Sequence, residues 1–188
     1  MFAVRTIVRI ANSGKHRNHS RIGDCVEYTT KFGSLDSYEK GGIEIVDDDP
    51  KNYVFSNIFE VASGAKPWEK IAVGKNMEYV LETIRAEGVS GWRTCDHDEY
   101  ALIMDGSVVT DLVKLDTPLA PADHPGSIAV TGEPAGKKMG KVTAGKGHMV
   151  LLPKGSAYRF SADAPSIIVL QTILGDDTIQ RWAEICLS

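Results

Sequence analysis

The residues with the clearest chemical potential lie close together in one short segment of the chain. Cys95, His97 and Glu99 are separated from one another by single residues. Because alternate residues of a β-strand point to the same face, this spacing predicts that a thiol, an imidazole and a carboxylate share one face of a sheet. Such a set is able to bind iron, zinc or copper. The alternative is that His97 and Glu99 are hydrogen-bonded polar residues of a pocket or its mouth.

Short apolar runs separated by Gly, Pro and acidic turn residues fill the chain from residue 53 onward. This pattern is typical of an all-β sandwich or barrel. The expected strands cover 53–61, 77–86, 100–104, 107–115, 148–152, 157–160 and 167–173. The 77–86 run also fits a helical stripe, and we assign it to a strand because of the motif that follows it.

The other segments are expected to surround this β-domain. Residues 1–52 are polar and irregular, with a basic cluster at 15–21, and they read as an arm that is either solvated or wrapped around a partner subunit. Residues 116–146 are rich in Pro and Gly and predict an extended surface loop. Asp177 is placed to cap a short C-terminal helix. The predicted organisation is an arm over 1–52 and a barrel with this helix over 53–188.

Two motifs resemble the signature of the cupin family. In the first, over 91–106, Glu99 precedes the turn glycine Gly106. The second, over 147–158, has the spacing Gly-x5-Pro-x-Gly-x2 and places Tyr158 where the family has a histidine. The resemblance implies a cupin-type jelly-roll barrel over roughly 53–173. We expect Gly106 and Gly155 to occupy turns with positive φ.

Most of the cupin metal ligands are absent. The family usually holds its metal with an HxH pair, one Glu and a third His. Aligned on Glu99, the paired positions hold other residue types, namely Trp92 and Thr94 or Arg93 and Cys95. His97 lies two or three residues after the second position of the pair, and Tyr158 stands at the position of the family's third histidine. We therefore expect a remnant pocket of Cys95, His97, Glu99 and Tyr158 without a bound metal. If a metal does bind, the first three of these residues are the expected ligands.

Three further segments, 74–82, 92–100 and 175–186, resemble the small subunit of the two-subunit hydroquinone 1,2-dioxygenases. This resemblance implies a heteromer, of α2β2 type, in which a larger cupin subunit carries the catalytic Fe(II). That enzyme opens hydroquinone with O₂ to give 4-hydroxymuconic semialdehyde. The present chain would then be the related barrel without iron or catalytic residues of its own.

Two other functions remain open from the residues. The chain is alternatively a self-sufficient homomeric dioxygenase or isomerase that acts through a metal at Cys95, His97, Glu99 and Tyr158. It is also compatible with a metal-free sensor of a small molecule. Metal binding that is lost on His97→Ala would distinguish the enzyme from the other two.

The composition limits the classes of partner that the chain is expected to bind. The net charge of −4 provides no basic field for nucleic acid, which favours a small molecule or another protein. No run of 18 apolar residues is present, and Arg5 and Arg9 interrupt the apolar N-terminus, so neither membrane insertion nor export is expected. Three widely spaced cysteines suit free thiols and predict a cytoplasmic protein.

Overall fold

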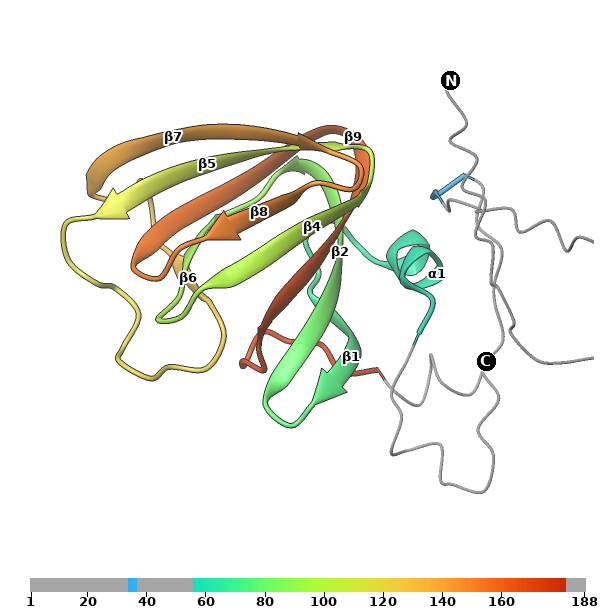
Figure 1. Cartoon of the computed structure of the whole chain (residues 1–188), viewed down its shortest axis with the longest axis horizontal. Coiled ribbons are helices and arrows are strands. Elements are labelled where there is room, and N and C mark those ends of the chain that lie inside the picture. The colour runs from blue at the N-terminus through green and yellow to red at the C-terminus, as the bar shows by residue number, and fades with distance from the viewer. Residues whose placement is uncertain (1–33, 37–55, 182–188) are drawn as a thin grey trace, which may run out of the picture. The chain divides into compact units, whose positions relative to one another are not determined.

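The computed structural model describes residues 34–36 and 56–181. In this part of the chain a nine-stranded antiparallel sheet curls around a core, and a short helix packs beside it (Figure 1). The elements are α1 (Ile58–Gly64), β1 (Ile71–Asn76), β2 (Tyr79–Val89), β3 (Trp92–Thr94), β4 (Glu99–Asp105), β5 (Ser107–Leu115), β6 (Ile128–Val130), β7 (Gly136–Gly145), β8 (Met149–Leu152) and β9 (Ser156–Ile173). The predicted jelly-roll fold is confirmed.

Strand β9 holds the sheet together, because it pairs with β2, β3, β4 and β5. Its beginning lies against β3 and β5, and its end lies between β2 and β4. The sequence predicted two strands over 157–160 and 167–173, whereas the structure has one strand of 18 residues. The exposed residues 163–165 join the two apolar runs opposite a shift in the pairing with β2.

The core lies inside the curled sheet and is built from the inward-facing positions of each strand. Alternation is clearest on β5, where the positions occupied by Val108, Thr110 and Leu112 are buried. Ile103 on β4 and Ile168 on β9 are fully buried in the same cluster. Each such aliphatic side chain contributes about 1.5–3 kcal/mol through removal of apolar surface from water.

Both signature glycines adopt the expected backbone conformation. Gly106, in the turn between β4 and β5, has a φ of 73°. Gly155, in the turn between β8 and β9, has a φ of 70°. Because side chains disfavour this region, the two glycines of the motifs are needed for the turns themselves.

The expected strand over 53–61 is wrong where the structure describes it. Asn57 caps α1, since its side chain accepts hydrogen bonds from the Phe59 and Glu60 amides at 3.0 and 3.2 Å. Ile58 and Val61, three residues apart on the helix, then pack in a small cluster with β1. The cap and this spacing favour a helix over the β-propensity of the segment.

The expected loop over 116–146 is also wrong, because it contains β6 and β7. Strand β7 pairs with β5 and is mostly exposed, so glycines within it cost little core packing. Gly136 is required there, since a Cβ would lie 2.1 Å from the carbonyl oxygen of Lys114. The prolines, at 118, 121, 125 and 134, fall between the strands.

The expected C-terminal helix does not begin at Asp177. Ile179 instead forms a parallel bridge with Ile71, and its amide donates to the Lys70 carbonyl oxygen at 2.8 Å. The rest of that helix, 182–188, lies outside the described residues, as does the arm over 1–52 except for residues 34–36. The division at residue 52 therefore stays a prediction. No helix among the described residues is long and apolar enough to cross a membrane.

Candidate functional site

The four residues singled out in the sequence meet inside the barrel. The donor atoms of Cys95, His97 and Glu99 all lie within 4.8 Å of one another. Tyr158, on β9, donates a hydrogen bond to Glu99 Oε2 at 2.7 Å. Cys95, Glu99 and Tyr158 are buried, and His97 is half-buried.

The reason for this convergence differs from the predicted one. Residues 95–98 form the connection between β3 and β4, so the three donors do not alternate along one strand. The connection is held by its own contacts: the Cys95 thiol donates to the His97 carbonyl oxygen, and Asp98 accepts from the Lys154 amide at 2.8 Å. A compact turn, rather than strand alternation, brings the side chains together.

Glu99 is the centre of a continuous hydrogen-bond network. Its Oε1 accepts from the Thr172 hydroxyl at 2.6 Å, while its Oε2 accepts from Tyr158. His97 Nε2 lies 3.0 Å from Thr172 Oγ1 and thereby joins the network. The Ile173 amide donates to the same nitrogen at 3.4 Å, which is a weaker contact. Both carboxylate oxygens are thus satisfied by the protein.

Burial keeps the Cys95 thiol and the Tyr158 hydroxyl of this network protonated. Desolvation, followed by the nearby charge of Glu99, raises the pKa of Cys95 to about 12. The same two causes raise the pKa of Tyr158 well above its usual value of 10.0. At neutral pH both groups are therefore hydrogen-bond donors rather than anionic ligands.

These residues do not fit the Fe(II) of a cupin site. Non-haem Fe(II) is typically held by two histidines and a carboxylate, and the described cluster offers only His97 as an imidazole. Both oxygens of Glu99 already accept hydrogen bonds, and the Cys95 thiol donates to the His97 carbonyl oxygen. The cluster is arranged as a hydrogen-bonded polar core, and we derive no catalytic step through a metal in it.

Replacing Tyr158 with phenylalanine is expected to lower the free energy of unfolding by about 1–3 kcal/mol, because Glu99 Oε2 loses its buried donor. Urea unfolding of the purified variant measures this loss. The matched control is Tyr100→Phe, on the outer face of β4 with an exposed fraction of 39%, which should change stability by less than about 0.5 kcal/mol. Equal effects of the two changes would contradict the buried network.

A second buried polar cluster was not found from the sequence. Lys70 and Glu82 are 5% and 0% exposed, and Lys70 Nζ lies 3.2 Å from Glu82 Oε2. The other oxygen of Glu82 accepts from the Thr178 hydroxyl at 2.5 Å. Burial raises the pKa of Glu82, against the lowering effect of Lys70. The sequence signal was the position of Glu82 between the inward-facing Val80 and Ile84 of β2.

Arg93, on β3, connects this cluster to the chain's last described segment. Its Nε donates to Ser127 Oγ at 2.9 Å, and its Nη2 donates to the Ser127 carbonyl oxygen at 2.7 Å. Nη2 also pairs with Asp177, and this hydrogen bond lowers the pKa of that carboxyl group. Lys70 Nζ donates to the same Ser127 hydroxyl at 3.2 Å. Two cations therefore converge on one serine.

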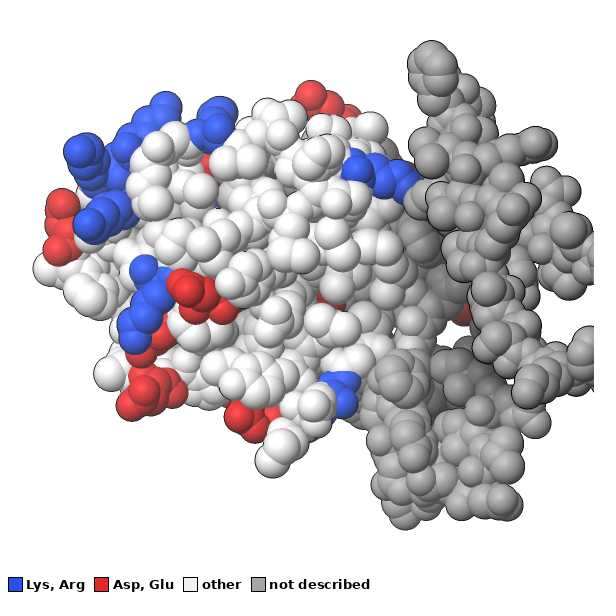
Figure 2. All heavy atoms as spheres, viewed as in Figure 1, with Lys and Arg blue, Asp and Glu red and all other residues white. Residues whose placement is uncertain are grey.

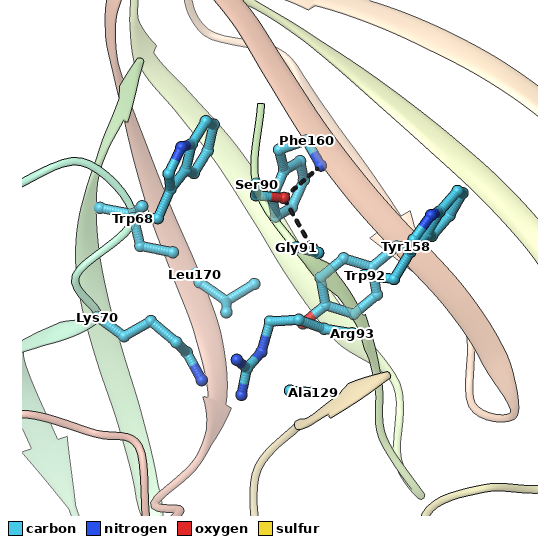
Figure 3. Close-up of a pocket in the computed structure, with 11 residues that line it drawn as sticks. Trp68, Lys70, Ser90, Gly91, Trp92, Arg93, Ala129, Tyr158, Phe160 and Leu170 are labelled. Carbon is cyan, nitrogen blue, oxygen red and sulfur yellow. Dashed lines mark hydrogen bonds between the residues drawn. The ribbon is translucent and has the colours of Figure 1, made fainter. Parts of the chain in front are cut away.

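A cavity of about 100 Å³ lies beside these cations (Figure 3). We call it the aromatic pocket; its lining includes Trp68, Lys70, Trp92, Arg93, Tyr158 and Phe160. In Figure 3 the ends of Lys70 and Arg93 point toward each other, with Trp68 at the other side of the pocket. Its rings and its two cations were not predicted as a site, because they come from separate elements.

The curled antiparallel sheet, the two glycine turns and the buried residues at the signature positions define a cupin barrel. No protein-family profile matches the chain, and no curated protein matches it. Solved structures, in contrast, do match the chain. A chain of the hydroquinone 1,2-dioxygenase PnpCD, in complex with Cd²⁺ and 4-hydroxybenzonitrile, is 48% identical, with a TM-score of 0.79 over 88% of this chain and 100% of that chain.

A second structure, hydroquinone 1,2-dioxygenase from Sphingomonas sp. TTNP3 with 4-hydroxybenzoate bound, is 51% identical over 84% of this chain and 96% of that chain, with a TM-score of 0.77. This chain belongs to the hydroquinone 1,2-dioxygenase family. A different chain of PnpCD, from a complex with Fe³⁺, matches at 11% identity and a TM-score of 0.54, over 72% of this chain and 37% of that chain. At that identity the likeness shows the fold alone.

Proposed function

We propose that this chain is the small, iron-free subunit of a heteromeric ring-cleaving dioxygenase that converts hydroquinone and O₂ to 4-hydroxymuconic semialdehyde. The observation that carries the proposal is the buried network around Glu99, at the position of a cupin metal site, in which both carboxylate oxygens and the Cys95 thiol are already hydrogen-bonded within the protein. The 48% identity over the full length of one PnpCD chain supports the choice of reaction.

The partner is a larger cupin subunit that carries the catalytic Fe(II), in a cytoplasmic α2β2 assembly. Two observations support a partner of this kind. PnpCD contains a chain that matches this one over 100% of its length and another of which only 37% is matched. The second chain also has the cupin-like fold, which is consistent with two related barrels of which one keeps the metal.

The surface offers a suitable place for this partner. An outer apolar face covers β2, β9, β4 and β8, and the centre of this face is free of charged side chains in Figure 2. One row crosses all four strands, with Leu81, Gln171, Tyr100 and Leu151 aligned by the strand pairing. Contiguous exposed apolar patches mark contacts with other proteins. We assign this face to the larger subunit.

Leu151→Glu is expected to weaken association with the larger subunit by at least tenfold, because it places a charge in the middle of an apolar interface. The matched control is Met139→Glu on β7, since Met139 and Leu151 are 49% and 45% exposed. Affinity co-purification of each tagged variant measures the effect. Retention of the partner by Leu151→Glu, or its equal loss in both variants, would contradict this assignment of the face.

The function itself is tested by recovering the tagged chain from its native cells. The expected result is a larger cupin subunit bound near one to one, with iron and hydroquinone-cleaving activity in the complex. Recovery of the chain alone, without the activity, would overturn the proposal.

The proximity of Cys95, His97 and Glu99 favours one second candidate, a homomeric metal-dependent cupin enzyme. A thiol, an imidazole and a carboxylate within 4.8 Å of one another suit zinc or copper better than Fe(II). This candidate requires a stoichiometric metal in the isolated chain. It also requires that His97→Ala removes the metal, so an unchanged metal content in that variant excludes it.

A further inference from the structure

We propose that the aromatic pocket of this chain binds a monocyclic aromatic carboxylate of the benzoate class, separately from any site on the iron-carrying subunit. The pocket combines a wall of rings with an end at which two cations converge. That combination matches a flat apolar body with one anionic group. The proposal does not depend on the proposed dioxygenase function.

The apolar part of the pocket is formed by side chains that are already held in place. Trp68 and Phe160 stack with their ring centroids 6.5 Å apart and an angle of 8° between the planes. The buried side chains of Ile84 and Leu170 complete the apolar lining. The Tyr158 ring lies with its centroid 5.3 Å from that of Phe160, and its hydroxyl is held by Glu99. Preorganised rings bind a planar ligand without further loss of side-chain freedom.

The backbone of Trp68 has a conformation that an ordinary structural position does not require. Its φ of 67° lies in the left-handed region, which a bulky side chain disfavours by about 1–3 kcal/mol. The hydrogen bond from its amide to the Arg85 carbonyl oxygen, at 2.9 Å, helps to maintain this geometry. Strain of this kind is concentrated at binding sites, and here it directs an indole into the pocket lining.

The cationic end still has donors to offer. Within the described part of the chain, Lys70 Nζ contacts Glu82 and Ser127, which leaves one of its three N–H groups without an acceptor. Arg93 uses Nε and Nη2 for Ser127 and Asp177, and its Nη1 has no acceptor among the described residues. Lys and Arg side chains carry donors only, so the ligand group at this end must be an acceptor.

The balance of charge favours a single negative charge on the ligand. Glu82 and Asp177 already pair with Lys70 and Arg93, so a dianion such as a phosphate monoester would be compensated less well than a monoanion. A carboxylate accepts two hydrogen bonds from separate donors with one charge. The pocket therefore suits a benzoate better than a phosphorylated ligand.

The size of the cavity limits the ligand to one ring. An apolar cavity of about 150 Å³ is known to hold one benzene molecule. The aromatic pocket measures about 100 Å³ and is partly open, with the exposed residues Gly91 and Ala129 at its rim. Because this volume is smaller than that of the benzene cavity, a benzoate with its carboxylate toward Lys70 and Arg93 leaves part of its ring outside the opening.

Ala129 provides a way to close the pocket without disturbing the core. It is exposed on β6 and lies directly opposite Arg93 in the strand pairing, so both side chains are on the same face. Ala129→Phe therefore covers the cationic end, and phenylalanine is well tolerated on a strand. Ala122→Phe, at an exposed residue outside the pocket lining, is the matched control.

The test is calorimetric titration of 4-hydroxybenzoate into the full chain, in whichever assembly it is purified. The expected result is one site per copy of this chain, lost or weakened at least tenfold in Ala129→Phe and in Arg93→Gln. Ala122→Phe should retain the site. The neutral analogue 4-hydroxybenzyl alcohol should bind at least tenfold more weakly, because it brings no charge to Lys70 and Arg93.

An unchanged number of sites and unchanged affinity in Ala129→Phe would overturn the proposal, since a site on another subunit is unaffected by that change. Equal binding of the acid and the alcohol would overturn the assignment to a carboxylate. The titration is equally decisive if the chain is purified without a partner. Failure of the dioxygenase proposal and failure of this one are therefore distinguishable.

Discussion

Replacing Lys70 with methionine is expected to lower the free energy of unfolding by about 3–5 kcal/mol, because the buried Glu82 must then either stay charged without its partner or bind a proton. Lys70 is 5% exposed and Glu82 is completely buried, so water does not replace the lost partner. The same change at an exposed pair is the control. Lys141→Met, whose ammonium lies 3.3 Å from Asp111 and is largely exposed, should cost less than about 1 kcal/mol.

The loss in Lys70→Met should depend on pH in a defined direction. Burial raises the pKa of Glu82 above its ordinary value of 4.5, and removing Lys70 raises it further. Above pH 4.5 the unfolded chain releases this proton while the native state keeps it, so stability falls as the pH rises. Urea unfolding at pH 4.5 and pH 7.5 should therefore show the larger loss at pH 7.5. An equal loss at both would contradict a buried carboxylate as its cause.

A double variant separates the missing charge from the missing packing. Lys70→Met combined with Glu82→Leu removes both charges and keeps apolar volume at both positions. Because buried ion pairs are often replaceable by apolar residues, the double variant should recover most of the stability lost in Lys70→Met. No recovery would mean that the lysine acts through its contact with Ser127 instead.

Gly106→Val is expected to lower the free energy of unfolding by about 3 kcal/mol or more. Its φ of 73° is unfavourable for a branched side chain, and a Cβ would lie 2.1 Å from Ser166 Oγ, which is buried. Strain and overpacking each cost about 1–3 kcal/mol. Urea unfolding of the variant measures the sum.

Gly155→Val is the matched control for the close contact. Gly155 has a φ of 70°, but a Cβ there would have no atom within 4 Å. The variant should lose about 1–2 kcal/mol from backbone strain alone. Equal losses at the two glycines would show that Ser166 does not restrict the turn between β4 and β5.

The sequence was sufficient for most of the barrel because its signals are local. Alternation predicted β5 over its whole length, and the glycine turns placed β4 and β8. The prediction failed at α1 because the cap at Asn57 lies within an aromatic segment that favours a strand. It failed at β7 because Gly and Pro were counted as loop residues, although an exposed edge strand accepts glycine.

The candidate site was only half predictable for a different reason. Cys95, His97 and Glu99 are neighbours in the chain, so they lie close together even though the backbone between them forms a turn instead of the expected strand. Thr172, which links His97 to Glu99, is more than 70 residues away and carries no motif. Lys70 and Arg93 meet at Ser127 through strand pairing, and the sequence alone does not give the register.

The location of the iron tests the central claim most directly. The measurement is the iron content and hydroquinone-cleaving activity of the purified complex with Cys95→Ala and His97→Ala combined in this chain. The account predicts that both quantities stay within about twofold of the unmodified complex, since the iron is held by the larger subunit. Loss of the iron together with the activity would place the metal at Cys95, His97 and Glu99 and contradict the account.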